Sequence, residues 1–285
     1  MIKRIITGVV LLGAAAGLIA LQGWYLRVAI LLMTLISFHE MFSAFKAKGM
    51  HAVRWPGFLF GVMAFASVSF ESELAWLGES PVLVSLMLCT MLGIICVVLK
   101  GKPDFDSVVA TVFPMLYPGL FYVFFMQLQN LNGRGMSTLA LIMAILMSAM
   151  NDTFALFVGK ACGKRKLIPG ISPNKTVAGS VAGIVTSAVF AVAIPLVFQL
   201  IDVRVNGAEG AVQLAPLWAF AIFGVIAGVI SQLGDLTASL VKRCCGIKDY
   251  GKLFPGHGGM MDRLDSVYWA TVVMYVYLLL GPFPA

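Results

Sequence analysis

Residues 80–99 read SPVLVSLMLCTMLGIICVVL, an uninterrupted run without a charged side chain. A helix needs about 20 consecutive apolar residues to cross the hydrocarbon core of a bilayer. The apolar residues of this run follow one another and do not alternate with polar ones, which is typical of a membrane helix and not of a strand in a membrane β-barrel. The run therefore predicts an α-helical membrane protein.

The rest of the chain has the same character. Hydrophobic residues make up 60% of it and charged residues 12%, whereas soluble domains carry about 25% charged residues. We therefore expect an all-α integral membrane protein with about nine transmembrane helices and no large soluble domain. The other apolar windows are 5–22, 24–45, 56–72, 107–128, 137–159, 177–200, 215–234 and 267–282.

Basic residues predict the orientation in the membrane. Most of the 20 lysines and arginines lie at the N-terminus or in every second loop, within 46–54, 100–102, 160–175 and 242–263. Basic loops stay on the cytoplasmic side, so we expect a multi-pass protein of the cell inner membrane. The net charge of +7 is thereby explained without a nucleic-acid partner. The two longest basic segments lie on the same side, so they can share a cytoplasm-facing polar site.

Polar residues concentrate in one segment, 231–266, which reads SQLGDLTASLVKRCCGIKDYGKLFPGHGGMMDRLDS. Ser231, Asp235 and Ser239 are four residues apart and share one face of a helix. Asp262 and Asp265 are three apart, and a divalent cation relieves the repulsion between two carboxylates so placed. Carboxylates together with substrate phosphates suit Mg²⁺. The alternative for the two acids is a first helical turn enriched in acids, which the helix dipole favours.

Three shorter features also allow chemistry. The glycines of the segment 255–259, PGHGG, let backbone N–H groups approach an anion, although the same composition fits a plain mobile loop. Asn151-Asp152-Thr153 places an ionisable group inside a membrane window, where such groups are costly and commonly functional; Glu40 gives a weaker version of this argument, since it also fits an interfacial position. Residues 172–176, SPNKT, predict a phosphate-binding turn before a helix, or a basic loop that only orients the protein.

Together these residues resemble the signature of the phosphatidate cytidylyltransferases. The signature combines a serine, a Lys-Arg pair, a Lys-Asp pair, His-Gly-Gly and a closing Asp-Arg-x-Asp. Upstream, residues 231–235 resemble the family's S-x-x-G-D, residues 172–176 its S-P-x-K-T, and residues 151–153 part of its A-D-[ST]-G-A-Y. The resemblance is strong over roughly the C-terminal half. The signature positions are filled by Ser239, Lys242, Arg243, Lys248, Asp249, His257, Gly258, Gly259, Asp262, Arg263 and Asp265.

The resemblance implies transfer of CMP from CTP to phosphatidate, which gives CDP-diacylglycerol and pyrophosphate in phospholipid biosynthesis. It implies Mg²⁺ held by Asp235 and Asp262, with Asp265 as a further ligand and Asp249 assisting. A second, monovalent cation and a homodimer are further expectations, and membrane lipids are expected partners. His257 is expected to orient a phosphate or stabilise the leaving group. The expected substrate-binding residues are Asp152, Ser172, Lys175, Thr176, Ser239, Lys242, Arg243, Lys248, Gly258, Gly259 and Arg263.

The chain departs from the family pattern at Phe154, where glycine is usual, and at Val177 and Ala178, where an aromatic and then an acid or amide are usual. Two interpretations of these departures stay open: a shifted lipid or nucleotide preference, or a divergent paralogue with reduced activity. We therefore keep two alternatives: a related CTP-dependent membrane enzyme for another lipid phosphate or alcohol, and an ion-coupled transporter. If the chain is a cytidylyltransferase, we expect residues 1–130 to form N-terminal membrane helices and residues 131–285 to form the catalytic membrane region.

Overall fold

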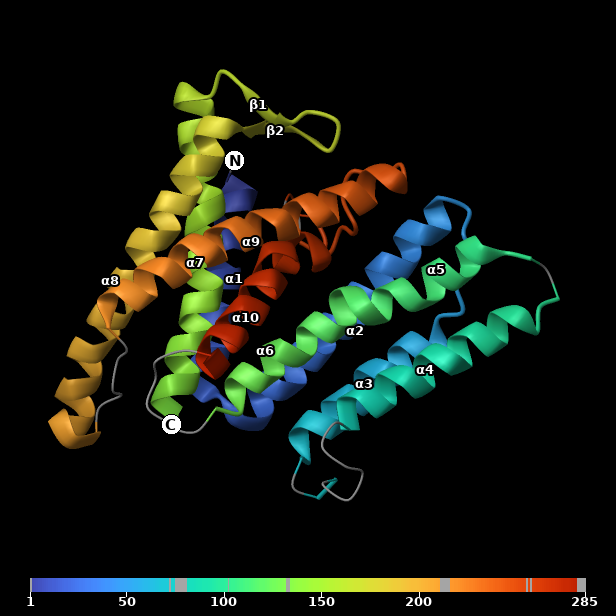
Figure 1. Ribbon diagram of the computed structural model, residues 1–285, viewed down its shortest axis with the longest axis horizontal. Helices are drawn as coiled ribbons and strands as arrows, with labels where there is room; N and C mark the ends of the chain where they lie inside the picture. Colours follow the sequence, from blue (N-terminus) through green and yellow to red (C-terminus); the bar gives the residue numbers. More distant parts are fainter. Residues whose placement is uncertain are drawn as a thin grey trace. The chain divides into compact units, whose positions relative to one another are not determined.

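The computed structural model describes residues 2–71, 73–74, 81–101, 103–131, 134–210, 216–254, 256 and 258–280. Within these residues the chain is almost entirely helical (Figure 1). The elements are α1 (Ile2–Leu21), α2 (Gly23–Ala47), α3 (Trp55–Ser69), α4 (Pro81–Val98), α5 (Phe105–Pro114), the π-helical segment η2 (Met115–Leu120), α6 (Phe121–Gln129), α7 (Arg134–Cys162), β1 (Lys166–Ile168), β2 (Ser172–Thr176), α8 (Val177–Gly210), α9 (Leu217–Cys244) and α10 (Met261–Leu280).

Each predicted apolar window contains a helix of this series. In the described part of the chain, six helical segments are long and apolar enough to cross a membrane, and Trp55–Ser69 is a shorter apolar helix. The predicted all-α, multi-pass membrane protein is therefore confirmed. The count of about nine spans stays a prediction. The helix α3 has 15 residues and reaches only about 22 Å, less than the hydrocarbon thickness of about 30 Å, and α1 and α10 are not among the six segments.

The chain divides into two compact units. The first comprises residues 1–127 and 241–263, and the second comprises residues 128–240 and 264–285. The end of α9 and the start of α10 thus belong to the first unit, together with the segment that joins them. The predicted boundary at residue 130 lies beside the break at residue 127, but most of the signature segment belongs with the N-terminal helices. The predicted division of roles between the two regions is not tested by this arrangement.

Aromatic rings form the core of the first unit. Phe38 and Phe42 of α2 are fully buried, and both rings lie about 6 Å from that of Phe58 on α3. Gly57 faces Phe42 so closely that a Cβ there would lie 2.7 Å from the ring. Small residues on α3 therefore let the α2 rings fill the space between the helices, as in other tightly packed membrane helices.

Small residues also determine packing in the second unit. A Cβ at Gly224 of α9 would lie 2.6 Å from the Cα of Ala188 on α8. A Cβ at Gly179 of α8 would lie 3.0 Å from the Cα of Gly159 on α7. Backbones that approach this closely require glycine at these two positions, so α8 packs tightly against both α7 and α9.

Residues 172–176 form a strand, which corrects the predicted turn. β2 pairs antiparallel with β1, and Lys166 lies opposite Thr176. Figure 1 shows this hairpin beyond the ends of α7 and α8. Thr176 is 4% exposed, and its Oγ1 accepts the N–H of Gly179 at 3.1 Å. This bond supplies one of the partners that the first turn of a helix lacks, so the strand ends where α8 begins.

Candidate active site

The signature segment starts where α9 ends. Gly246 has a φ of +68° and its N–H donates to the carbonyl of Arg243, while the N–H of Ile247 donates to that of Lys242. Glycine is the usual residue in this left-handed position after a helix. Further along, the N–H of Phe254 donates to the carbonyl of Gly258 at 2.9 Å. The chain then turns directly into α10.

Asp262 is the centre of this loop. Its Oδ1 accepts from Lys242 Nζ at 2.8 Å, and its Oδ2 accepts the N–H groups of Tyr250 at 2.8 Å and Gly259 at 3.0 Å. The side chain of Asp262 is only 5% exposed and that of Lys242 only 11%. The Lys242 ammonium lies 5.5 Å from the centre of the Tyr250 ring. One carboxylate thus connects the end of α9, the middle of the loop and the start of α10.

Glu40 reaches the same loop from α2. Its side chain is buried, with 6% of the residue exposed. Oε1 accepts the N–H of Met260 at 3.0 Å and Oε2 that of Met261 at 2.8 Å. The contact explains why an acid is tolerated inside an apolar helix, since a buried carboxylate requires donors around it.

The remaining predicted residues of this loop differ in exposure. Gly259 is buried, whereas Gly258 has a φ of +85° and is half-buried. His257 lies outside the described residues, so its predicted role is untested. The side chains of the other basic and acidic candidates are exposed, where a phosphate could reach them; these are Arg243, Lys248, Asp249 and Arg263.

A second polar cluster lies in the second unit, on α9 and β2. Lys175 Nζ pairs with Asp235 Oδ2 at 2.6 Å, and the two side chains are 18% and 26% exposed. The strand therefore carries the lysine of SPNKT to the acid of S-x-x-G-D. A Cβ at Gly234 would lie 2.5 Å from the Trp269 ring and 2.8 Å from the carbonyl of Asp265, so the glycine of that motif is required for close packing of α9 on α10.

Buried amides connect three helices behind this pair. Asn151 of α7 donates to the carbonyl of Gly228 at 2.8 Å and accepts from Gln232 of α9 at 2.8 Å. Gln232 also donates to the carbonyl of Ser180 on α8 and accepts that residue's hydroxyl. Ser231 lies 3.2 Å from the hydroxyl of Ser148 on α7. A network with its donors and acceptors paired holds its members rigidly, so it fixes the helix face that carries Asp235.

Two further acids meet at one hydroxyl. Ser266 Oγ lies 3.0 Å from Asp152 Oδ2 and 3.3 Å from Asp265 Oδ1. Asp265 is 7% exposed and also accepts the N–H of Ser266 at 2.7 Å. The predicted candidates Asp152 and Asp265 are therefore neighbours, although 113 positions separate them in the numbering.

The other candidates of this unit occupy the edges of the cluster. Ser172 is half-buried at the start of β2. Ser239 is 9% exposed on α9. Phe154, where the family usually has glycine, is 40% exposed on α7, and its ring centre lies 6.4 Å from that of Phe190 on α8. This departure therefore adds an aromatic contact between two helices and leaves the polar groups of the cluster in place.

A carboxylate can bind Mg²⁺ only through lone pairs that no other donor occupies. Within the described residues, the Oδ1 of Asp235 has no donor, so one full oxygen is available. Asp262 has three donors for about four acceptor positions, which leaves one. Among the described residues no three His, Cys, Asp or Glu side chains group as a metal site. Mg²⁺ is usually bound by one or two carboxylates with substrate phosphates, so the available oxygens of Asp235 and Asp262 suit the ion.

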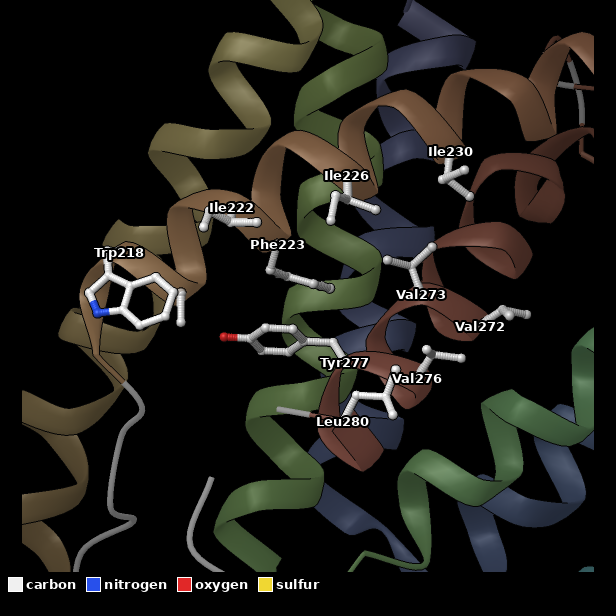
Figure 2. Close-up of a pocket in the computed structure, with 11 residues that line it drawn as sticks. Trp218, Ile222, Phe223, Ile226, Ile230, Val272, Val273, Val276, Tyr277 and Leu280 are labelled. Carbon is white, nitrogen blue, oxygen red and sulfur yellow. The ribbon is translucent and has the colours of Figure 1, made fainter. Parts of the chain in front are cut away.

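An apolar groove lies between α9 and α10 in the second unit (Figure 2). Its volume is about 610 Å³. The rings of Phe223 and Tyr277 stand 4.6 Å apart within it. Its lining contains aliphatic and aromatic side chains alone: Trp218, Ala219, Ile222, Phe223, Ile226, Ile230, Val272, Val273, Val276, Tyr277 and Leu280.

Comparison with known proteins agrees with the signature. The profile of the cytidylyltransferase family matches residues 2–280. A phosphatidate cytidylyltransferase of Bacillus subtilis is 32% identical over 284 residues, which cover 99% of this chain and 98% of the relative.

The chain belongs to the cytidylyltransferase family.

Two other relatives extend the similarity beyond one lineage. A phosphatidate cytidylyltransferase of Synechocystis is 29% identical and covers 98% of this chain and 97% of its own length. The chloroplastic phosphatidate cytidylyltransferase 5 of Arabidopsis thaliana is 28% identical over 98% of this chain and 72% of its own length. Membership of the cytidylyltransferase family, inferred from the C-terminal motifs, is thus confirmed over nearly the whole chain. It also removes the support for an ion-coupled transporter.

Gln232, Ser266 and Glu40 make more polar contacts in this cytidylyltransferase than the sequence predicts. Gln232 is an unmarked position within S-x-x-G-D, and Ser266 follows the last signature acid. The only available signal for either was a polar side chain in an otherwise apolar helix. Glu40 gave the same signal, but its partners at Met260 and Met261 are 220 or more positions away and cannot be found from local spacing.

Proposed function

We propose that this protein transfers CMP from CTP to phosphatidate and so forms CDP-diacylglycerol and pyrophosphate. The observation that carries the proposal is the full-length similarity to phosphatidate cytidylyltransferases together with the polar groups of both units. Many of these groups lie on α9, α10 and the segment between them, which are the elements that carry the signature, and others lie on α7 and β2.

In this reaction an oxygen of the phosphatidate phosphate attacks the α-phosphorus of CTP. One P–O bond forms, the bond to the β-phosphate breaks, and pyrophosphate leaves with the electron pair. Phosphoryl transfer depends mainly on positioning and on neutralising charge. A phosphatidate phosphate is already anionic near neutral pH, so no strong base is required.

The basic side chains have two kinds of role in this proposal. Lys242 and Lys175 are each fixed by an aspartate, so they present an ammonium at a defined place. Lys248 and Arg263 are exposed and can follow a triphosphate as it binds. We assign phosphate binding to both kinds, because a fixed cation stabilises developing charge without reorganising and a mobile one captures the substrate.

We propose Mg²⁺ as the metal, with Asp235, Asp262 and Asp265 as candidate ligands and Asp249 assisting. When bound, the ion would neutralise phosphate charge and orient the reacting oxygens. Asp235 would give the oxygen that Lys175 does not occupy, and Asp262 its one remaining lone pair. A second, monovalent cation and a homodimer stay predictions.

We place the polar face on the cytoplasmic side of the inner membrane, with about nine spans. The support is the distribution of basic residues, which favours the cytoplasm for the segments 160–175 and 242–263. CTP is available on that side. Cysteine-labelling at Lys248 and at the exposed residue Trp24 would test this orientation, because the two positions are expected on opposite sides.

We further propose that the groove between α9 and α10 takes an acyl chain of the lipid substrate. The groove begins at Ile230 and Val272. Ile230 lies about 7 Å before Asp235 along α9, and Val272 lies about 10 Å after Asp265 along α10. A lipid whose phosphate lies at the polar groups would direct its chains along these apolar side chains. Ile226→Trp should therefore lower kcat/KM about tenfold for long-chain phosphatidate and much less for a short-chain form, if several methylene contacts are lost.

The matched control is Val185→Trp, which adds the same bulk at a 57% exposed position of α8 outside the groove. Equal losses of kcat/KM for the long-chain and short-chain substrates in Ile226→Trp would contradict the acyl-chain assignment. A change of oligomeric state with unchanged chain-length preference would instead indicate that a second copy covers the groove.

The main test is pyrophosphate release from the purified protein. We expect release only when CTP, phosphatidate and Mg²⁺ are all present, and loss of release after chelation of the metal. Offering other nucleotides, other lipid phosphates and lipid alcohols tests the alternative substrates. If folded protein released pyrophosphate faster with a lipid alcohol than with phosphatidate, the proposed substrate would be wrong.

A further inference from the structure

Glu40 binds the start of α10 through both oxygens of its carboxylate. The two donors are the N–H groups of Met260 and Met261, and α10 begins at Met261. The first N–H groups of a helix have no partner within the helix, and a negative charge is favourable there. Glu40 therefore caps α10 from a helix that lies more than two hundred residues earlier in the chain.

The glycines of the loop provide the space for this carboxylate. A Cβ at Gly251 would overlap Oε1 of Glu40 and lie 2.8 Å from its Cδ; a Cβ at Gly259 would overlap both oxygens. Neither glycine has a left-handed φ, so backbone freedom is not the reason for glycine at these positions. The second glycine of His-Gly-Gly is instead explained by the close approach of Glu40.

Two carboxylates together hold three consecutive N–H groups. Asp262 accepts that of Gly259 at 3.0 Å, and Glu40 accepts the next two. The backbone of residues 259–261 is thereby fixed at every donor. Asp262 and Arg263 follow immediately, so their directions depend on this short stretch.

We propose that Glu40 is a positioning residue for the cytidylyl transfer. It orients the first turn of α10, and with it Asp262 and Arg263, from outside the signature. The proposal rests on the proposed function for its activity measurement, but its structural part stands on the contacts of Glu40 alone. Glu40 acts through other residues and does not itself contact the substrate.

The first experiment compares Glu40→Ala, Glu40→Gln and, as the matched control, Ser43→Ala. Ser43 lies on the same helix and donates only to the carbonyl of His39. We expect kcat per folded molecule to fall about a hundredfold in Glu40→Ala, as small misplacements of reacting groups do, with a smaller rise in KM for CTP because Arg263 is displaced. Glu40→Gln keeps one acceptor oxygen, so its kcat should lie between those of Glu40→Ala and Ser43→Ala.

Amide hydrogen exchange of residues 258–263 gives a readout that does not depend on activity. Exchange there should accelerate in Glu40→Ala and not in Ser43→Ala. Folded Glu40→Ala with unchanged exchange would overturn the proposal even if the substrate assignment fails. Accelerated exchange together with unchanged kcat would also overturn it, because the contact would then be structural only. Failure of the proposed function itself would appear as an inactive wild-type protein.

A double substitution tests the steric part. Gly251→Ala alone should lower kcat about tenfold or more, because the new Cβ meets the Glu40 carboxylate. In the Glu40→Ala background the carboxylate is gone and the new Cβ lies 3.2 Å from the Cα of Gly259, so the same change should lower kcat by a clearly smaller factor. Residues in contact show such non-additivity. Equal effects of Gly251→Ala in the two backgrounds would contradict the inference.

Discussion

Replacing Asp262 by Asn tests whether this residue holds the loop as well as serving the reaction. The amide has the same shape, but it keeps one acceptor oxygen where the carboxylate has two. The best orientation retains the N–H groups of Tyr250 and Gly259 and turns the NH₂ group toward Lys242. The loop contacts then survive, and the ion pair at 2.8 Å is lost.

The cost of the change follows from burial. Removing one partner of a buried pair costs about 3–5 kcal/mol, and here the side chains are 5% and 11% exposed. The Tyr250 ring at 5.5 Å from the ammonium is present in both proteins, so its contribution cancels in the comparison. We therefore expect Asp262→Asn to destabilise the protein by about 3–5 kcal/mol. Asp262→Ala should cost more, because two N–H groups also lose their acceptor at about 1–3 kcal/mol each.

Thermal unfolding in detergent measures the order of stability, and amide exchange over residues 248–260 locates the effect. The Tyr250 and Gly259 amides should stay protected in Asp262→Asn and exchange quickly in Asp262→Ala. Asp249→Asn is the matched control for stability, since the side chain of Asp249 is exposed. If Asp262→Ala unfolded at the wild-type temperature with wild-type exchange, the proposed role of Asp262 in the loop would be refuted.

Two further predictions concern single positions. The hydroxyl and N–H of Ser107 donate to Asp104 at the start of α5 and lower the pKa of its carboxyl. Because the folded pKa lies below the unfolded one, the cap contributes stability above about pH 4 and loses it as the pH falls further. The melting temperature of wild type should therefore fall more steeply on acidification than that of Asp104→Asn. Gly183→Ala places a methyl group against the buried Asn151 side chain and should cost about 1–3 kcal/mol in detergent unfolding, whereas Gly17→Ala, with open space around it, should cost nothing measurable.

The sequence predicted the helices well because membrane helices satisfy their own backbone and need only a long apolar run. It was wrong about residues 172–176, where four polar residues and a proline give no periodicity and the pairing with β1 decides the structure. The spacing of Asp262 and Asp265 correctly placed both on one helix. Their distant partners could not be predicted, since Lys242 meets Asp262, and Asp152 meets the neighbour of Asp265 at Ser266, only through the tertiary fold.

The contacts of Asp262 and Glu40 change how the signature of this cytidylyltransferase is interpreted. A run of fixed residues suggests that each one contacts substrate or metal. Here Asp262 already has three donors, and Gly259 is required by an acid outside the motif. Part of the signature therefore specifies the shape of the loop, and the exposed side chains of Arg243, Lys248, Asp249 and Arg263 are directly accessible to the substrate. It follows that substitutions at these exposed positions should lower activity without lowering stability, while those at Asp262 lower both.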